Sequence, residues 1–470
     1  MDTKQLVVIG AGPGGYPAAF LAADLGMQVT LIDQRTNPGG ECLYCGCIPS
    51  KALLHIANVL TESKDAARWG ITFGEPKIDL GRVRTWKESV VQKLTGGLGQ
   101  LSKQRKVNYI QGRAKFLDAH TVSVRKMDGS QERLPFEHAI LAAGLRPATI
   151  PGLPSSPRIW DSTGALELGS IPKNLLVIGG GYIGLELGSV YAALGAEVSV
   201  VEMMPGLLPG ADRDLVLPLA KRLEKLFAAI MLNTKVVEMK EEPDGIRVRL
   251  EGAGAKEPEQ VYDRVLVSVG RKPNSHDLGL EATSVKTDPR GFVVVDAQRR
   301  TAEPSIFAIG DIAGEPMLAH KATHEGLTAV QVLAGKKAAF EPRAIPAVVY
   351  TDPEIAWCGL TETQAEKQKL PIKVARFPWA ASGRSITLDR TDGVTKLIVD
   401  PETERVLGAG IAGPSAGELI AEATLAIEMG ATAKDLALTI HPHPTLSETV
   451  MEAAEVFYGH CTHIYRRRQN

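Results

Sequence analysis

Two stretches of the chain repeat one order of apolar, glycine-rich and polar segments. Each opens with a run of four apolar residues, 6–9 in the first stretch and 175–178 in the second. A glycine-rich turn, a helix-length segment and a second apolar run ending in an acid follow in both, and the two helices are expected to end near Gly26 and Leu194. Short continuous apolar runs are typical of buried parallel strands, so the pattern predicts two related strand-turn-helix-strand units.

Three further apolar runs lead into turns that contain glycine and extend this pattern. They span residues 138–143, 265–269 and 306–309. From about residue 345 the segments shorten, and two helices are predicted there, at 416–429 and 445–457. The chain is therefore expected to be an α/β protein with a separate C-terminal α+β domain.

Prolines mark the expected boundaries between these parts. Proline restricts the residue before it, and Arg146-Pro147 and Arg271-Lys272-Pro273-Asn274 stand between apolar segments. With the change of pattern near residue 345, we therefore predict four consecutive segments: 1–147, 148–272, 273–344 and 345–470.

The composition is that of a globular protein with several cores. A chain of 470 residues is too long for one core, and 44% hydrophobic with 23% charged residues argues against extended disorder. Lysine and arginine number 53 against 54 acids, so no global charge steers the protein toward nucleic acid or an acidic membrane. The basic tail Arg466–Arg468 is expected to be a solvated terminus, and no nucleic-acid partner is predicted.

Hydrophobicity also argues against export and against a membrane span. The N-terminus carries an acid at Asp2 and soon enters a glycine-rich turn, unlike a signal peptide. The weakly charged run 175–196 contains Glu186 and six glycines, which disfavours a spanning helix. We expect a cytoplasmic protein.

Both glycine-rich turns have the spacing G-x-G-x-x-G. Between a strand and a helix, this spacing lets the backbone approach a pyrophosphate while the helix N-terminus supplies unpaired amides. The acids that end the following strands, Asp33 and Glu202, can accept hydrogen bonds from ribose hydroxyls. Each unit is therefore predicted to bind one dinucleotide.

Two acids refine this prediction. Glu202 would repel the 2′-phosphate of NADP, and no arginine follows it closely, so NAD is expected in the second unit. Asp311 follows the apolar run 306–309 and is either a ligand for a hydroxyl-rich group or the N-cap of the next segment.

Three of the five cysteines, Cys42, Cys45 and Cys47, crowd into six positions. In a chain with so few cysteines such a cluster is a redox centre, a metal site or a buried structural feature. A closed zinc site needs four ligands, and no compact group of Cys or His follows nearby, so no metal is expected. We favour redox chemistry.

The segment 42–51, which reads Cys-x-x-x-x-Cys-Ile-Pro-Ser-Lys, resembles the redox-active disulfide of the flavin disulfide reductases. Over its whole length the chain is similar to bacterial dihydrolipoyl dehydrogenases, with supporting stretches at 86–88, 158–163, 317–320 and 377–384. The resemblance implies two Rossmann-like domains, for FAD and NAD, and a C-terminal dimerisation domain. It also implies a homodimer that acts on a lipoylated carrier protein, a separate chain.

By the same resemblance the site residues fall into three groups. FAD contacts are expected from Gly10, Gly12, Gly14, Gly15, Asp33, Gly40, Lys51, Ala143, Gly144, Asp311, Met317, Leu318, Ala319 and His320. NAD contacts are expected from Gly179, Gly181, Tyr182, Gly184, Glu202 and Gly270. The catalytic group is Cys42, Cys47, His443, Glu448, Lys51 and Glu186.

The resemblance also assigns roles to the thiols and the histidine. His443, oriented by Glu448, would deprotonate the dihydrolipoyl dithiol at the disulfide of the other subunit, because exchange needs a thiolate and histidine titrates near neutral pH. Cys42 would be attacked, and Cys47, nearer to the flavin, would leave as a thiolate. The alternative for His443 is a packed or solvent-facing side chain.

Three further expectations concern the surroundings of the flavin. Lys51 would pair with Glu186 and tune the reduced state, the alternatives being a surface lysine and a helix-face glutamate. A helix starting near His320 would point its positive end at the flavin pyrimidine. His441 is either a supporting residue or simply packed.

Three positions depart from the family pattern: Cys45, Tyr182 and Asp33. Residues five apart in an ideal helix have Cα atoms roughly 8 to 9 Å apart, beyond the limit of about 7 Å for a disulfide. A Cys42–Cys47 disulfide therefore requires a distorted turn, whereas Cys42–Cys45 would fit a regular helix more easily. Our hypothesis is that Cys45 is a bystander in turnover that traps an off-pathway disulfide on overoxidation. Tyr182 either gates the nicotinamide site or packs, and Asp33 makes the same ribose contacts as the commoner glutamate.

Two alternative functions are kept beside this one. A related flavin disulfide reductase would act on a glutathione-type disulfide or on mercuric ion, but Glu202 and the solitary Cys461 disfavour both. A lipoyl-carrier-binding flavoprotein with low turnover is the second, and the complete group of Cys42, Cys47, His443 and Glu448 speaks against it.

Overall fold

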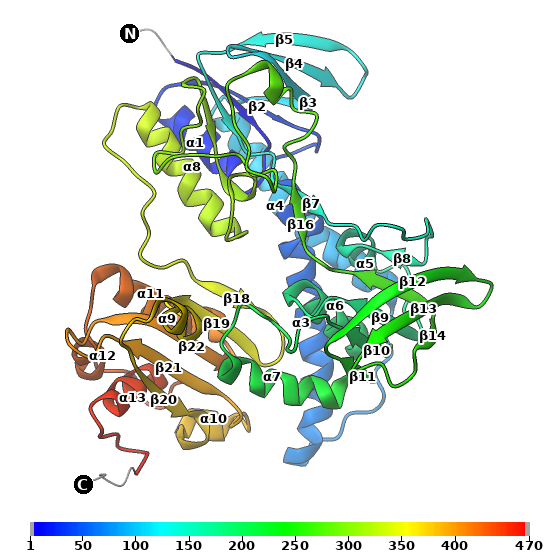
Figure 1. The fold of residues 1–470 in the computed structure, drawn as a ribbon, viewed down its shortest axis with the longest axis vertical. Helices are drawn as coiled ribbons and strands as arrows, with labels where there is room; N and C mark the ends of the chain where they lie inside the picture. Colours follow the sequence, from blue (N-terminus) through cyan, green and yellow to red (C-terminus); the bar gives the residue numbers. More distant parts are fainter. Residues whose placement is uncertain (1–3, 466–470) are drawn as a thin grey trace.

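The computed structural model describes residues 4–465 and contains three regions, each built on its own sheet (Figure 1). A seven-stranded sheet lies at the top of the view, a five-stranded parallel sheet at the right and a five-stranded antiparallel sheet at the lower left. The predicted α/β class with a C-terminal α+β domain is confirmed. The basic tail Arg466–Arg468 lies outside the described residues.

The first sheet starts from the first repeated apolar run. Its order is β17-β6-β1-β2-β3-β4-β5; the strands are parallel from β17 to β3 and antiparallel from β3 to β5. Central β1 is buried from Leu6 to Ile9, which explains why its sequence is continuously apolar. The strands are β1 (Gln5–Ile9), β2 (Gln28–Asp33), β3 (Asn108–Asp118), β4 (Thr121–Lys126), β5 (Gln131–Pro135), β6 (His138–Leu141) and β17 (Ile306–Ala308).

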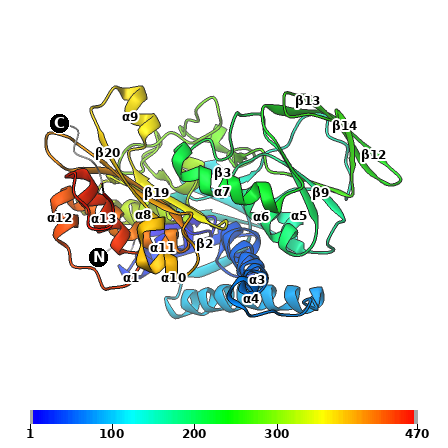
Figure 2. The ribbon, with the colours of Figure 1, turned by 90° about the horizontal axis from the view of Figure 1, so that it is seen from below.

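Helices cover this sheet and connect it to the second region. Helix α1 packs on α8, while α3 and α4 extend away from the sheet, and α4 lies along the outer edge of the molecule (Figure 2). The helices are α1 (Gly15–Asp24), α2 (Gly40–Cys45), α3 (Cys47–Asp65), α4 (Leu80–Gln104) and α8 (Ala319–Leu333), with 3₁₀ turns η1 (Ala66–Trp69), η2 (Leu280–Ala282) and η3 (Gly310–Ala313).

The second region repeats the same unit around a parallel sheet of order β11-β10-β9-β15-β8. An antiparallel sheet, β12-β13-β14, is appended to it. Its elements are β8 (Ile159–Trp160), α5 (Ser162–Glu167), β9 (Asn174–Ile178), α6 (Tyr182–Ala193), β10 (Glu197–Val201), α7 (Arg213–Leu226), β11 (Ala229–Met231), β12 (Thr234–Glu242), β13 (Gly245–Gly252), β14 (Glu259–Tyr262) and β15 (Arg264–Val267).

A two-stranded antiparallel ladder stands where the chain enters and leaves the second region. Strand β7 (Leu145–Pro147) pairs with β16 (Arg271–Pro273), Pro147 opposite Arg271 and Leu145 opposite Pro273. Proline is tolerated at the ends of such short strands, because its missing N–H removes few of the hydrogen bonds between the strands there. The second region is thus one continuous insertion in the first.

The third region is an antiparallel sheet, β18-β19-β22-β21-β20, covered by helices. Its elements are β18 (Ala347–Val349), β19 (Glu354–Gly359), α9 (Glu362–Gln368), β20 (Lys373–Pro378), η4 (Trp379–Ala381), α10 (Gly383–Thr387), β21 (Val394–Val399), β22 (Val406–Gly413), α11 (Ala416–Met429), α12 (Ala433–Leu438) and α13 (Glu448–Phe457).

The helices of this region differ in part from the prediction. Helix α11 has the predicted bounds, but α13 begins at Glu448 and not at Thr445, because the Glu448 carboxylate accepts from the Thr445 amide at 2.7 Å and holds the preceding residues in a loop. Helices α9, α10 and α12 were not predicted, since five to seven residues are too few to show a helical period.

The predicted apolar runs are strands that end earlier than expected. Strand β6 ends at Leu141, β15 at Val267 and β17 at Ala308. The residues that follow β6, Ala142 and Ala143, leave the ladder and line a cavity. Strand ends at a binding edge are therefore less regular than their hydrophobicity indicates.

Within residues 4–465, one apolar helical segment is long enough to cross a membrane by length and composition alone. It spans Gly40–Trp69 and contains α2, α3 and η1. Helix α3 packs against α6 and α4 and buries Leu53, Leu54 and Ala57 in a core cluster. The run 175–196 forms β9 and α6 instead. Buried core helices pass the same test, so this is weak evidence for a membrane span.

Lys396, almost fully buried in β21, connects the third region to the second. Its ammonium donates to Asp212 and Asp214 at 2.7 Å each and to Glu362 at 2.6 Å. A buried charge must be paired to be tolerated, and three carboxylates provide that here. The network joins β21 and α9 to the start of α7, and so fixes the C-terminal region against the second region.

Candidate active site

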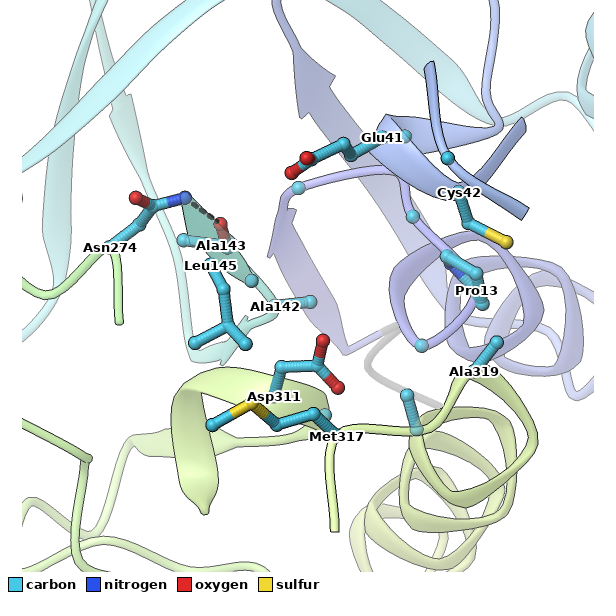
Figure 3. Close-up of a pocket in the computed structure, with 18 of the residues that line it drawn as sticks. Pro13, Glu41, Cys42, Ala142, Ala143, Leu145, Asn274, Asp311, Met317 and Ala319 are labelled. Carbon is cyan, nitrogen blue, oxygen red and sulfur yellow. Dashed lines mark hydrogen bonds between the residues drawn. The ribbon is translucent and has the colours of Figure 1, made fainter. Parts of the chain in front are cut away.

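The first glycine-rich turn borders a cavity of about 470 Å³ between the end of β1, helix α2 and the start of α8 (Figure 3). Thirteen residues predicted from the sequence line it: Gly10, Gly12, Gly14, Asp33, Gly40, Cys42, Cys47, Ala143, Gly144, Tyr182, Asp311, Met317 and Ala319. Residues from distant parts of the chain thus meet around one space, and we call it the first cavity.

The repeated glycines have the same physical cause in both units. A Cβ on Gly10 would lie 2.3 Å from the carbonyl oxygen of Ala142, and one on Gly179 would lie 2.5 Å from that of Ser268. Both residues also have φ near 100°, a conformation that side chains disfavour. Each turn therefore passes directly against the neighbouring strand end, which only glycine permits.

The first cavity fits a dinucleotide pyrophosphate. A Cβ on Gly12 would meet nothing nearer than Gly40 Cα at 3.9 Å, so the backbone there is open to the cavity. Helix α1 has Gly14 at its N-cap and no side-chain cap, so its positive end is open to an anion, although the Tyr16 amide already donates to the Gly12 carbonyl at 3.1 Å.

The two strand-end acids also make equivalent contacts. Asp33 accepts from the amides of Ala11 at 2.7 Å and Arg35 at 2.9 Å. Glu202 accepts from Gly180 at 2.6 Å and Met204 at 2.7 Å. Each carboxylate therefore holds its glycine-rich turn against the strand. The remaining lone pairs of the carboxylate can accept hydrogen bonds from ribose hydroxyls.

Of the other residues predicted to hold NAD, Gly181 is the N-cap of α6. Gly184 lets α6 pack directly against the glycine-rich turn, since a Cβ on Gly184 would lie 2.4 Å from the oxygen of Gly179. Gly270 has φ 117° and directly precedes β16. Tyr182, the first residue of α6, lines the first cavity and a smaller neighbouring one. The second unit thus has the local geometry of the first.

Four residues predicted to contact FAD do not line the first cavity. Gly15 packs α1 onto its turn, because a Cβ there would lie 1.8 Å from the oxygen of Gly10. Lys51 lines the smaller cavity. Leu318 is the N-cap of α8. The His320 ring is hydrogen-bonded to the Pro346 carbonyl at 2.7 Å, which holds it away from the first cavity.

The start of α8 nevertheless faces the first cavity as predicted. The helix begins at Ala319, and both Ala319 and Ala322 line the space. No side chain caps this helix, so its N-terminal amides carry partial positive charge toward the cavity.

Asp311 points into the first cavity beside Met317 (Figure 3). It lies inside the turn η3, whose N-cap is Ile309, so the alternative prediction of an N-cap role is wrong. Burial raises the pKa of the Asp311 carboxyl, against the opposing charges of Lys321 and Arg271. An acceptor placed this way suits a hydroxyl-rich ligand.

The loop that carries Asp311 is held by Glu325, a fully buried residue of α8. Its carboxylate accepts from the Gly310 amide at 2.6 Å. Lys321 at 3.0 Å and Arg299 at 2.8 Å balance its charge. Glu325 thereby connects α8 to the position of Asp311.

Several residues around the first cavity carry no signal in the sequence motifs. Arg271 forms an ion pair with Glu41, and Asn274 donates to the Ala143 carbonyl at 2.9 Å (Figure 3). Both Arg271 and Asn274 belong to the proline-containing segment that was interpreted only as a boundary. Polar residues at that boundary were the available signal.

The predicted distortion between Cys42 and Cys47 is present. Helix α2 ends at Cys45 and α3 begins at Cys47, and Gly46 between them has φ −137° and ψ −117°. A Cβ on Gly46 would lie 3.0 Å from the Glu41 oxygen, so the chain folds tightly back on α2. All five cysteines are free thiols in this structure.

Cys42 and Cys47 lie close enough for each thiol to shift the pKa of the other. Donation from the Cys42 thiol lowers the pKa of Cys47 to about 7, and the charge of Lys51 acts in the same direction against burial and Glu186. The same bond, together with burial, raises the pKa of Cys42. The reduced pair therefore holds its negative charge on Cys47.

Lys51 and Glu186 form a pair next to Cys47. The ammonium lies 2.7 Å from the carboxylate, and Glu186 is buried on α6. The Tyr350 amide donates to the second carboxylate oxygen at 3.0 Å, and Lys51 Nζ lies 4.6 Å from the centre of the Tyr350 ring. This pair sets a fixed charge arrangement beside the thiols.

His443 and Glu448 form a second pair, at the start of α13. Nδ1 of His443 lies 2.9 Å from the carboxylate, whose other oxygen accepts from the Thr445 amide. Partial burial opposes ionisation, but the bonds from Thr445 and His443 hold the pKa of the Glu448 carboxyl below its usual value. The His443 side chain is 73% exposed.

The structure does not bring His443 to the thiols of its own chain. His443 lines neither the first cavity nor the smaller one, and α13 lies in the third region at the lower left of Figure 1. His441 is packed: its Nε2 lies 2.8 Å from Glu422, Nδ1 bonds the Thr439 carbonyl, and the side chain is 5% exposed.

Family comparisons cover most of the chain. The family described as pyridine nucleotide-disulphide oxidoreductase matches residues 4–326, and its dimerisation domain matches residues 345–454. A dihydrolipoyl dehydrogenase from Haemophilus influenzae is 52% identical over 459 residues, which are 97% of this chain and 96% of the relative. One from Geobacillus stearothermophilus is 47% identical over 464 residues, 99% and 98% of the two chains.

Solved structures agree with this match. LpdA from Mycobacterium tuberculosis superposes with a TM-score of 0.89 at 26% identity, covering 96% of this chain and 99% of that one. The HOCl-induced flavoprotein disulfide reductase RclA from Escherichia coli gives 0.84 at 28% identity, covering 95% and 98%. The chain therefore belongs to the pyridine nucleotide-disulphide oxidoreductase family and, within it, to the dihydrolipoyl dehydrogenases.

Proposed function

We propose that this chain oxidises protein-bound dihydrolipoyl groups to lipoyl groups with NAD as the final acceptor. The observation that carries the proposal is the Cys42–Cys47 pair, which stands on either side of the break at Gly46 on the wall of the first cavity. As a disulfide, a pair in that position can take up the two electrons of a dithiol, and in its reduced form it can pass them into the cavity.

Members of this family use FAD and NAD, and the residues present fit both. The turn at Gly10–Gly15, Asp33 and Asp311 would hold FAD, and the turn at Gly179–Gly184 with Glu202 would hold NAD. Bound flavin supplies the two-electron relay between thiols and nicotinamide that side chains lack.

The His443–Glu448 pair can act as a general base through one defined ring nitrogen. Because Nδ1 of His443 is held by Glu448, the free lone pair is on Nε2, which takes the proton from a dihydrolipoyl thiol. The site is completed by a second subunit, since His443 lines no cavity with the thiols of its own chain. The dimerisation domain supports a homodimer.

The thiol steps follow from the charges beside Cys47. The substrate thiolate attacks Cys42 Sγ, the Cys42–Cys47 bond breaks, and Cys47 leaves as a thiolate stabilised by Lys51. The second substrate thiol then loses its proton and attacks the first substrate sulfur in the mixed disulfide, which breaks the bond to Cys42 and leaves Cys42 to take up a proton. The cyclic lipoyl disulfide is released, and Cys42 returns as a thiol.

Three finer points belong to the same proposal. The four segments 1–147, 148–272, 273–344 and 345–470 are the FAD-binding domain in two parts, the NAD-binding domain between them and the dimerisation domain. The β7–β16 ladder at residues 145–147 and 271–273 supports this division. The carrier is a separate lipoylated protein, and the location is cytoplasmic.

Anaerobic turnover of the purified, FAD-loaded protein tests the function. With NAD and dihydrolipoamide, or a lipoylated carrier domain, NADH should form at a rate of roughly 1 to 10³ per second. Reduced glutathione in place of dihydrolipoamide is the matched control and should give none. Failure of dihydrolipoamide to reduce the flavin would reject the function, and slow NADH formation after fast flavin reduction would favour the low-turnover alternative.

A further inference from the structure

A third thiol, Cys45, lies three residues after Cys42 on α2. Residues three apart in a helix have Cα atoms about 5 Å apart, within the range that a disulfide spans. Cys45 lines the first cavity with Cys42 and Cys47, and it lines the smaller cavity with Cys47. It is therefore placed to compete for the Cys42 sulfur, and exchange confined to Cys42 and Cys47 requires that it does not.

Two arginines stand beside Cys45 and favour its ionisation. The Arg35 guanidinium lies 3.5 Å from Cys45 Sγ, and its Cζ lies 5.1 Å from the centre of the Tyr44 ring, which holds it in place. Arg271 comes from β16 and lines both cavities that Cys45 lines. Nearby cations stabilise a thiolate, so both side chains act to make Cys45 a reactive nucleophile.

Glu41, drawn on α2 in Figure 3, brings one negative charge to the same place. It lies four residues before Cys45, so the two side chains share one face of the helix. Its carboxylate forms an ion pair with Arg271, whose side chain is 17% exposed. Burial has the largest effect and raises the pKa of Cys45, and the charge of Glu41 raises it further. Arg35, Thr163 and Arg271 act in the opposite direction.

Lys51, Glu186 and Tyr182 also line the smaller cavity with Cys45. Lys51 and Glu186 are paired at 2.7 Å, so their charges largely cancel toward Cys45. Burial raises the pKa of Tyr182 to about 12, so its phenol is neutral near neutral pH. The carboxylate that opposes the arginines at Cys45 is therefore that of Glu41.

We propose that Glu41 is a specificity-determining residue that keeps Cys45 out of the disulfide exchange, a role that rests on the disulfide chemistry of the proposed function. Without that carboxylate, Cys45 loses its proton to solvent more readily, and its thiolate attacks Cys42 Sγ. The Cys42–Cys45 bond forms, the Cys42–Cys47 bond breaks, and Cys47 leaves as a thiolate with the electron pair. This exchange needs no added oxidant, and it replaces the working disulfide by one that ends on the wrong thiol.

Alkylation of Cys45 by iodoacetamide measures its ionisation in the FAD-loaded protein. The Cys42→Ser, Cys47→Ser background leaves Cys45 as the one thiol of the loop, and peptide mapping separates it from thiols elsewhere. Glu41→Gln should move the midpoint of the pH profile down and raise the rate near neutral pH roughly 3-fold, because the gain in thiolate exceeds the loss of nucleophilicity. Arg271→Gln should move the midpoint up, because it removes the opposite charge.

These opposite signs separate a charge effect from a structural one. Both substitutions break the same ion pair, so loosening of α2 would move both rates in one direction. Glu41→Asp keeps the charge and should restore the unmodified rate. Glu366→Gln, an exposed change on α9, is the matched control and should leave the Cys45 rate unchanged. FAD content is the folding check for every variant.

Formation of the competing disulfide is measured in the Cys47→Ser protein. DTNB, an aromatic disulfide, oxidises Cys42 and Cys45 to a disulfide through a mixed disulfide and releases two aromatic thiolates. With Glu41→Gln this disulfide should form roughly 3-fold faster than with Glu366→Gln, as followed by peptide mapping of acid-quenched samples.

Neither measurement uses dihydrolipoamide or NAD, so a negative result here is separate from a failure of dihydrolipoamide turnover. Alkylation midpoints that move together in the two charge variants, or that stay in place, would overturn the proposal. A rate of disulfide formation no higher than that of the control would do the same.

Discussion

Cys45 shares helix α2 with Cys42, yet its sulfur has other neighbours. The Arg35 guanidinium lies 3.5 Å from its Sγ, and Thr163 is a hydrogen-bond partner. Burial, assisted by the charge of Glu41, raises the pKa of Cys45. The charges of Arg35 and Arg271 act in the opposite direction but do not outweigh burial, and a thiol that stays protonated is a poor nucleophile for exchange.

Cys45→Ser should therefore retain most of the NADH formation supported by dihydrolipoamide. Cys42→Ser and Cys47→Ser should each abolish it, because each removes one half of the exchanging pair. Steady-state rates under anaerobic conditions provide the comparison, with FAD content as the folding control. Loss of turnover in Cys45→Ser equal to that in Cys42→Ser would contradict a bystander role.

The low pKa of Cys47 also fixes a pH dependence. Its folded-state value of about 7 lies below the ordinary value of 9.0, so ionised Cys47 stabilises the reduced protein. That contribution is fully present above pH 9 and is lost as the pH falls through about 7. Thiolate reactivity should follow the same midpoint.

Iodoacetamide alkylation of Cys47 in the two-electron-reduced protein should rise with pH around a midpoint near 7. Cys42→Ala should move that midpoint upward, because it removes the donated hydrogen bond, and Lys51→Gln should do so to a smaller extent. Peptide mapping of alkylated Cys47 across pH measures both. An unchanged midpoint in Cys42→Ala would show that the hydrogen bond is not the cause.

At the level of elements, α8 supports the first cavity from two positions. Its uncapped N-terminus faces the cavity, while Glu325, nearly two turns further on, holds the Gly310 amide. Removing the Glu325 charge leaves Lys321 and Arg299 without their shared partner in a buried place. Such a loss is expensive for folding and loosens the loop that carries Asp311.

Glu325→Gln should lower the free energy of unfolding by roughly 3 to 5 kcal/mol and release FAD at lower urea concentration. Glu366→Gln, an exposed change on α9, is the control and should cost less than about 0.5 kcal/mol. Urea unfolding followed by flavin fluorescence and by circular dichroism separates the two effects. Equal costs for both variants would argue against a positioning role for Glu325.

For the whole molecule, the separation of His443 from the thiols has a testable consequence. A Cys42→Ser subunit keeps its histidine, and a His443→Gln subunit keeps its thiols. In a hybrid dimer, one of the two sites then contains both intact groups. A homodimer of either variant contains no site with both groups intact.

Mixing the two variants under conditions of subunit exchange should restore about a quarter of the unmodified activity, since half of the dimers are hybrids with one working site. Rates of lipoamide-dependent NADH formation before and after exchange measure this. No recovery, despite hybrid dimers shown by differential tagging, would place both groups in one subunit.

Much of the fold could be predicted from the chain because its causes are local. Buried parallel strands must be continuously apolar, and Gly10 and Gly179 are required where the turn touches the neighbouring strand. The need for a break between Cys42 and Cys47 likewise follows from helix geometry. Short helices such as α12 and the exact start of α13 were missed, because six residues carry no period and a side chain of Glu448 decides the boundary.

By itself, then, the sequence determined the two nucleotide-binding units, the thiol pair and the class of chemistry, since these depend on spacing along a few consecutive residues. Only the tertiary structure decided which residues far apart in the chain meet. It placed Glu41 against Arg271, turned His320 toward Pro346, and held Asp311 through Glu325. It also joined Cys461 to Glu452. Such contacts depend on how whole elements pack, and no local pattern encodes them.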